Sequence, residues 1–113
     1  MTTSRKYGPN ELESSSLCFG TMQFGDGASE KDSQEMYEAC LHNGINFFDT
    51  SDTYGDGRSE KFLSEIIKST SEKLYVSTKL GRRVRGTNHP KGYKHEPMEE
   101  FIDRSLINLG VEC

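Results

Sequence analysis

Apolar residues along this chain fall into two alternating patterns. Short apolar runs at residues 17–22, 45–48 and 73–78 predict buried strands. After each run comes a segment in which apolar residues recur every three or four positions, as they do on one face of an amphipathic helix. Strand and helix therefore alternate three times, which predicts a parallel α/β sheet with covered faces and right-handed crossover connections.

The first two predicted helices carry start and stop signals. Ser29 and Asp32 have the spacing of a capping box, in which each side chain binds the other's free backbone N–H. Asn43-Gly44 is typical of a left-handed helix stop. We expect Ser59 to cap the second helix, with Glu60 in its positive first turn.

The third helix is expected to begin at Pro97 and to end at Gly110. Its apolar positions, like those of the other two helices, should face the sheet. The residues expected on these apolar faces are Met36, Tyr37, Cys40 and Leu41; Phe62, Leu63, Ile66 and Ile67; and Met98, Phe101, Ile102, Leu106 and Leu109.

The segment before the first strand is polar and is set apart as residues 1–16. Gly8-Pro9-Asn10 marks a turn within it, and the segment is either a short hairpin or a mobile arm. Residues 17–113 then make up the α/β unit. At 113 residues the chain is long enough for one small domain.

Charge and cysteine usage narrow the class of protein. A net charge of −4 gives no overall attraction to nucleic acid or to an anionic membrane, and no apolar run reaches the roughly 20 residues of a membrane span. Cys18, Cys40 and Cys113 are odd in number and form no CxxC pair, which favours reduced thiols in a cytoplasmic protein. A loop at 80–95 holds five basic residues, for which a solvated loop near the site is favoured over a phosphate or nucleic-acid contact.

Three ionisable residues occupy matching places in the predicted sheet. Asp49 and Lys79 each end a strand, and Tyr54 lies in the loop after the first of these strands. Because the carboxyl ends of parallel strands share one edge, we expect the three side chains to meet there. A lysine ammonium stabilises a phenolate and brings proton transfer by tyrosine within reach, while a carboxylate holds the lysine charged.

Each of these residues also has an ordinary structural interpretation. Asp49 by itself would usually be a turn former or helix cap, Tyr54 would pack at the rim, and Lys79 would be solvated. Residues 55–57, Gly-Asp-Gly, lack the spacing of the Rossmann and Walker nucleotide loops. These glycines are better explained as the tight turn that returns the tyrosine toward the lysine. The three ionisable residues together, at matched positions, favour a catalytic site.

The stretch GINFFDTSDTYGDGRSE, residues 44–60, resembles the central motif of the aldo-keto reductases. LCFGTMQFG at 17–25 is similar to the first strand of that family, KLYVSTK at 73–79 to its third strand, and PMEEFIDRSLINLGVE at 97–112 to its next helix. The resemblance implies part of a (β/α)8 barrel, about three N-terminal βα units. It also implies NADPH-dependent reduction of aldehydes and ketones, a small-molecule carbonyl substrate and no metal.

The resemblance gives Asp49, Tyr54 and Lys79 the roles of three members of a catalytic tetrad, with Asp49 also a tentative cofactor contact. The fourth member is a histidine after the fourth strand, and neither His42 nor the two histidines of the 80–95 loop has that position. The sequence therefore resembles the first third of a reductase, and we expect the 113-residue chain to be inactive by itself.

Two alternatives to a reductase stay open at this point. One is a non-catalytic binding or regulatory module, since the family resemblance includes potassium-channel beta subunits. The other is the by-product of a shortened reading frame. The sequence does not indicate the substrate, the preference between NADPH and NADH, or the oligomeric state.

Overall fold

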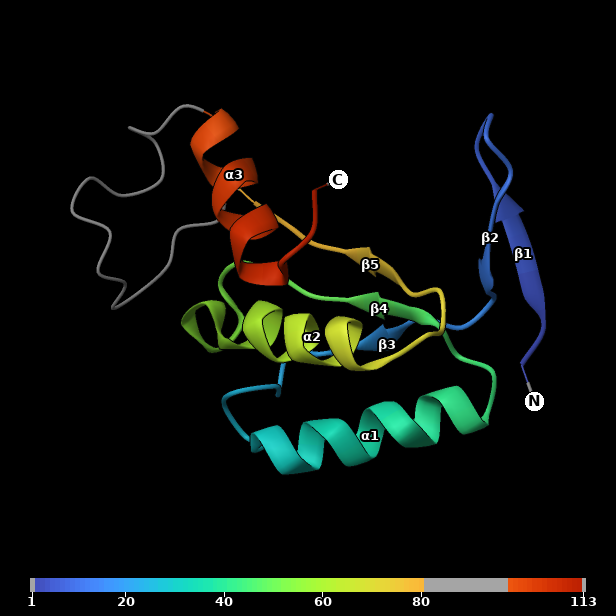
Figure 1. Ribbon diagram of the computed structural model, residues 1–113, viewed down its shortest axis with the longest axis horizontal. Helices are drawn as coiled ribbons and strands as arrows, with labels where there is room; N and C mark the ends of the chain where they lie inside the picture. The colour runs from blue at the N-terminus through green and yellow to red at the C-terminus, as the bar shows by residue number, and fades with distance from the viewer. Residues whose placement is uncertain (1, 81–97, 113) are drawn as a thin grey trace.

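The protein, seen here as a computed structural model, is described at residues 2–80 and 98–112. A three-stranded parallel sheet forms its centre, in the order β3 (Phe19–Gly20), β4 (Phe47–Asp49) and β5 (Tyr75–Ser77) (Figure 1). The strands are short, but their order and direction confirm the predicted parallel α/β arrangement.

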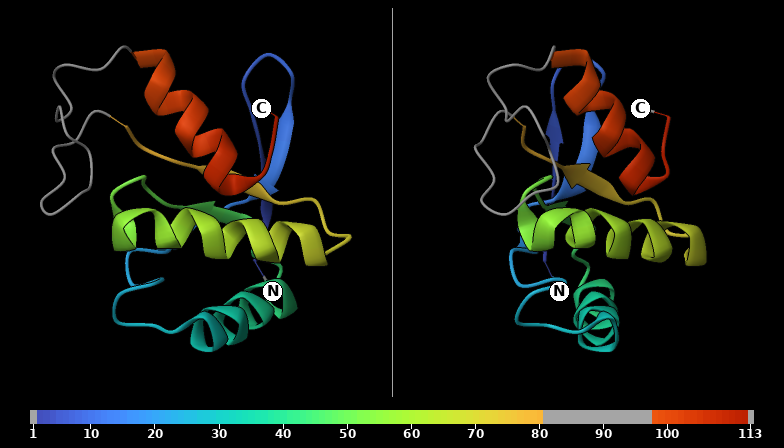
Figure 2. Two further views of the ribbon diagram at one scale, coloured as in Figure 1. Left: turned by 60° about the vertical axis from the view of Figure 1, so that its left-hand side comes forward. Right: turned by 90° about the vertical axis from the view of Figure 1, so that its left-hand side faces the viewer.

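Three helices cover one face of this sheet (Figures 1 and 2). They are α1 (Glu30–His42), α2 (Arg58–Ser69) and α3 (Met98–Leu109), and a short 3-10 turn, η1 (Tyr54–Gly57), leads into α2. Helix α2 packs against both of the others and lies between them. The helices thus protect the face of the sheet that carries its apolar core.

Phe48 of β4 and Leu63 of α2 are at the centre of the core, and neither is exposed to solvent. The ring of Phe48 lies 5.9 Å from the ring of Tyr37 on α1 and 6.2 Å from that of Phe19 on β3. Because side chains alternate along a strand, Phe47 and Asp49 face away from the helices and are only partly buried. The sheet therefore has a packed helix face and an open face.

The capping-box prediction for α1 is confirmed. The backbone N–H of Asp32 donates to the Ser29 hydroxyl at 3.1 Å, and the backbone N–H of Ser29 donates to the Asp32 carboxylate at 3.0 Å. Gly44 adopts the expected left-handed conformation after the helix, at φ 74°. Gly110 does the same after α3, at φ 68°.

The prediction that Ser59 caps α2 is wrong. Helix α2 begins one residue earlier, at Arg58, and its N-cap is Gly57 in the left-handed region at φ 89°. The Ser59 hydroxyl lies inside the protein instead, 2.8 Å from the hydroxyl oxygens of Thr21 and Thr50. A serine near the start of a helix can either cap the helix or hydrogen-bond to the sheet. Here the Ser59 hydroxyl is hydrogen-bonded to residues at the ends of the strands.

The first apolar run is a shorter and less buried strand than predicted. Only Phe19 and Gly20 pair with β4, while Leu17 and Met22 at either end of the run are each 58% exposed. Some predicted helix-face residues of α1 and α3 are exposed as well, because the buried stripe of these two helices is narrower than the apolar stripe. These exposed residues are Met36, Met98 and Ile102.

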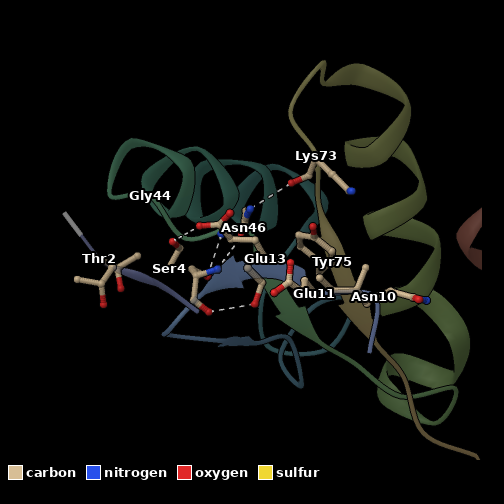
Figure 3. A pocket seen from close by; sticks show the side chains of 13 residues that line it. Thr2, Ser4, Asn10, Glu11, Glu13, Gly44, Asn46, Lys73 and Tyr75 are labelled. Carbon is tan, nitrogen blue, oxygen red and sulfur yellow. Dashed lines mark hydrogen bonds between the residues drawn. The ribbon is translucent and has the colours of Figure 1, made fainter. Parts of the chain in front are cut away.

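The segment before the sheet forms a hairpin, β1 (Ser4–Tyr7) and β2 (Leu12–Ser15), with its turn at the predicted Gly-Pro-Asn stretch. Asn46 joins it to the sheet, accepting from the backbone N–H of Ser15 at 2.8 Å and donating to the carbonyl of Lys73 at 3.3 Å. Figure 3 shows these bonds at a polar pocket of about 530 Å³ between the hairpin and the amino ends of β4 and β5.

Candidate functional site

Strand register brings Asp49 and Lys79 together at the carboxyl end of the parallel sheet. Asp49 ends β4 directly opposite Ser77 of β5, and Lys79 follows two residues later on the same face. Backbone pairing continues past both strands, since the N–H of Thr50 donates to the carbonyl of Ser77 at 2.8 Å and that of Asp52 to the carbonyl of Lys79 at 3.4 Å. This continued pairing aligns the two charged side chains.

The Lys79 ammonium is the centre of the site. Its Nζ atom donates to Asp49 Oδ2 at 2.5 Å, to the backbone carbonyl of Thr50 at 3.0 Å and to the Tyr54 hydroxyl at 3.1 Å. The same atom lies 4.8 Å from the centroid of the Tyr54 ring. The structure thus brings together the three residues that the sequence places at this edge.

A run of left-handed residues returns Tyr54 to the lysine. Gly55, Asp56 and Gly57 have φ values of 56°, 54° and 89°, so the chain reverses sharply just after the tyrosine. A Cβ atom on Gly55 would lie 2.9 Å from the carbonyl oxygen of Phe24, closer than such atoms approach. Glycine is therefore required at this position both by the backbone angle and by the neighbouring loop.

The surroundings of Lys79 keep its ammonium charged. Burial lowers the pKa of Lys79, but hydrogen bonds with Asp49 and Tyr54 outweigh this effect, so its pKa lies above the ordinary value. The Lys79 side chain is 47% exposed and that of Asp49 is 34% exposed, so the site opens to solvent.

Two features near the site escaped the sequence reasoning. The first is Cys18, whose thiol interacts electrostatically with Asp49 and Lys79. Burial and the Asp49 carboxylate raise the pKa of this thiol, and the Lys79 ammonium partly opposes them. Glu60 is completely buried beside the end of β5, where its carboxylate accepts a hydrogen bond from Thr78 at 2.7 Å. Tertiary packing of α2 and of the segment before β3 brings these residues near the site.

Other sequence candidates lie elsewhere. His42 is in the last turn of α1. The carbonyl of the next residue, Asn43, accepts a hydrogen bond from the backbone N–H of Thr2. His42 therefore lies near the N-terminal hairpin, at the opposite end of the sheet from Lys79. Residues 81–97, with the basic loop residues, His89 and His95, fall outside the described residues, as does Cys113.

Neither a metal-binding cluster nor a membrane-spanning helix occurs among residues 2–80 and 98–112. Within these ranges no group of three or more histidine, cysteine, aspartate or glutamate side chains is placed to hold a metal ion. None of the described helices has the length and apolar character needed to cross a membrane.

Residues 16–113 match the aldo/keto reductase family. A probable voltage-gated potassium channel subunit beta of Arabidopsis thaliana is 28% identical over 112 residues, covering 96% of this chain and 34% of the relative. The NADP(+) aldo-keto reductase yakc of Schizosaccharomyces pombe is 28% identical over 100 residues, covering 85% of this chain and 29% of the relative.

A solved structure has the same architecture. The holo form of aldo-keto reductase AKR11C1 from Bacillus halodurans superposes with a TM-score of 0.76 at 28% identity, over 98% of this chain and 37% of that one. The sheet and helices described above are therefore part of a (β/α)8 barrel. The chain belongs to the aldo/keto reductase family, and it spans about a third of the length of the curated relatives it matches.

Proposed function

We propose that this segment supplies the proton-donating part of the active site of an NADPH-dependent reductase that converts aldehydes or ketones to alcohols. The observation that carries the proposal is the placement of the Lys79 ammonium, 3.1 Å from the Tyr54 hydroxyl and 2.5 Å from the Asp49 carboxylate. Membership of the aldo/keto reductase family supports the same reaction class.

In this mechanism Tyr54 is the general acid. Its hydroxyl proton passes to the carbonyl oxygen of the substrate, which becomes the alcohol, and Lys79 stabilises the phenolate that is left. Asp49 holds the lysine ammonium in place and keeps it charged. The Lys79 and Asp49 side chains on either side of this contact are partly exposed to solvent in this segment.

NADPH is the cofactor that we propose, and when bound it supplies the hydride that goes to the carbonyl carbon. The NADP(+) designation of the yeast relative supports this choice. In this chain the residue proposed to contact the cofactor is Asp49, which binds Lys79 through Oδ2 and has a second oxygen with which to accept a hydrogen bond. The proposed reaction needs no metal, because Tyr54 supplies the proton and the cofactor supplies the hydride.

The test is the variant Tyr54→Phe in a complete barrel that carries this segment. Turnover of an aldehyde should fall ~10²–10⁴-fold, the usual contribution of a general acid, while NADPH affinity measured by fluorescence titration should stay the same. Tyr75→Phe is the matched control, because that tyrosine lies on the neighbouring strand β5 and not at the reacting edge. Unchanged turnover in Tyr54→Phe would refute the proton-donor role.

A regulatory function is the second candidate, and the similarity to a plant potassium channel subunit beta favours it. On that proposal the barrel would bind a cofactor and a partner protein without turnover. The same variant separates the two functions, because a regulatory module has no reduction rate for Tyr54→Phe to lower. We propose a cytoplasmic location for either function, supported by the unpaired thiols of Cys18 and Cys40.

A further inference from the structure

Glu60 is a completely buried carboxylate at the meeting point of three elements. It lies in the first turn of α2, where Oε1 accepts from the Thr78 hydroxyl at 2.7 Å and Oε2 accepts from the Asn108 side-chain amide of α3 at 2.9 Å. A buried carboxylate is costly unless it is hydrogen-bonded, and these two bonds together with the helix N-terminus offset that cost. Glu60 is thus fixed in position and can fix its partners.

Ser59, the preceding residue, makes a similar connection to the other strands. Its Oγ atom lies 2.8 Å from the hydroxyl oxygens of Thr21 and Thr50, and all three residues are completely buried. The Thr21 hydroxyl in turn donates to the backbone carbonyl of Asp49 at 2.9 Å. This chain of hydroxyl groups joins the start of α2 to the ends of β3 and β4.

The partners of these two residues are the immediate neighbours of the charged pair. Thr50 directly follows Asp49, and Thr78 directly precedes Lys79. Consecutive residues at the start of one helix therefore hold the ends of two strands, β4 through Ser59 and β5 through Glu60. The neighbour of Asp49 is thus hydrogen-bonded to Ser59, and the neighbour of Lys79 is hydrogen-bonded to Glu60.

We propose that Ser59 and Glu60 are positioning residues that set the distance between Lys79 and its two partners, Asp49 and Tyr54. The catalytic consequence rests on the proposed function, whereas the effect on the ion pair does not. We name the two anchoring residues the strand-end clamp.

The geometry leaves little tolerance at this point. The contact from Lys79 Nζ to the Tyr54 hydroxyl is 3.1 Å, and a hydrogen bond weakens beyond about 3.2–3.5 Å. A displacement of the Lys79 backbone by about 1 Å changes the length and angle of this contact, and misplacements of this size can lower rates ~10²-fold. Thr78 is the residue through which such a displacement is prevented.

The test compares Thr78→Val with Thr78→Ser in a complete barrel that carries this segment. Valine keeps the shape of threonine and removes the hydroxyl that donates to Glu60, whereas serine keeps the hydroxyl. The pKa of Lys79 is measured by NMR from its side-chain ¹³Cε shift, assigned with Lys79→Met. We expect Thr78→Val to move this pKa down toward the ordinary lysine value and Thr78→Ser to leave it raised.

Kinetics give an independent readout. In Thr78→Val, kcat should fall about 10-fold or more while KM for the carbonyl compound changes little, because the lost bond affects placement of the proton donor and not substrate contacts. Ile66→Val is a control for stability alone, since Ile66 is buried in the core of the same helix and the change costs about 0.5–1.5 kcal/mol. Its Lys79 pKa and its kcat should match those of the unaltered protein.

The outcomes separate the two proposals. A Thr78→Val protein that folds and keeps both the Lys79 pKa and kcat overturns the positioning role, as does an equal effect of Ile66→Val. If Thr78→Val fails to fold, Thr78→Ala, which removes the same hydroxyl donor to Glu60 and leaves the carboxylate in place, decides the question by the same two measurements. Unchanged turnover in Tyr54→Phe refutes the proposed function instead, and the Lys79 pKa still tests the clamp.

Discussion

The Nζ atom of Lys79 lies 2.5 Å from Oδ2 of Asp49, although 30 residues separate the two in sequence. Two ladder bonds beyond the strand ends produce this contact, because they keep β4 and β5 paired as far as the lysine. Both side chains are partly exposed, so the pair is weakened by solvent and salt as a source of stability. Its importance lies in fixing an ammonium beside the Tyr54 hydroxyl.

The first prediction is that the ion pair stabilises the protein in a pH-dependent manner that the variant Lys79→Met removes. The folded-state pKa of Lys79 is raised above its unfolded value, so protonation favours the folded state. The contribution to the free energy of unfolding is therefore complete below about pH 10, near the unfolded pKa, and is lost as pH rises through the folded pKa.

The measurement is urea unfolding of the unaltered protein and of Lys79→Met at several pH values between 7 and 11. The difference between the two free energies should be constant up to about pH 10 and should shrink above it. Lys61→Met, at an exposed position on α2, is the control for loss of a surface charge. A difference that grows above pH 10 would contradict the direction of the pKa shift.

The second prediction is that Asn46→Ala loosens the hairpin from the sheet. The substitution removes the acceptor for the Ser15 N–H and the donor to the Lys73 carbonyl, and each lost bond should cost about 1–3 kcal/mol where the remaining group is shielded from water. Hydrogen exchange of the Ser15 amide should become faster. Asn46→Asp keeps the acceptor, so the Ser15 amide should stay protected in it; equal exchange in both variants would contradict this assignment.

The third prediction concerns the core beneath the site. Leu63 is completely buried at the centre of α2, and Leu63→Ala should lower the free energy of unfolding by about 2–5 kcal/mol through lost burial and a residual cavity. Ile107→Ala is the matched control, because Ile107 is 78% exposed on α3 and its truncation should have a much smaller effect. Equal losses would mean that the exposed face of α3 is covered in solution.

The sequence predicted the fold because the local signals agree with one another. The capping box at Ser29 and Asp32 and the glycine stop at Gly44 are each satisfied within a few residues, so the sequence contains all that is needed to recognise them. The candidate site was predictable for a similar reason. Asp49 and Lys79 follow neighbouring parallel strands, and topology alone then brings them to the same edge.

Tertiary contacts explain what the sequence did not predict. Ser59 has the sequence position of a helix cap, yet its hydroxyl is used by Thr21 and Thr50, which only the assembled sheet brings near. Glu60 was expected to be an ordinary first-turn acidic residue. Its partners Thr78 and Asn108 are 18 and 48 residues away, so the buried network could not be recognised from local spacing.

The last prediction is that Gly55→Ala disturbs the site through its loop. At φ 56° an alanine is strained by about 1–3 kcal/mol, and its Cβ would also lie 2.9 Å from the Phe24 carbonyl oxygen. The loop must shift, and Tyr54 directly precedes it, so the contact between the tyrosine and Lys79 should lengthen. Turnover in a complete barrel should fall together with stability.

Two other glycine variants separate the effect of backbone strain from that of the steric contact with Phe24. Gly8→Ala places an alanine at φ 66° in the hairpin turn with no atom within 4 Å of the new Cβ, so it measures backbone strain alone. Gly20→Ala has open space and no positive φ, so it should change stability little. Gly55→Ala should therefore be the most destabilising of the three and the only one of them to lower the pKa of Lys79, as followed by NMR. A Lys79 pKa that is unchanged in a folded Gly55→Ala protein would show that Tyr54 keeps its position without this glycine.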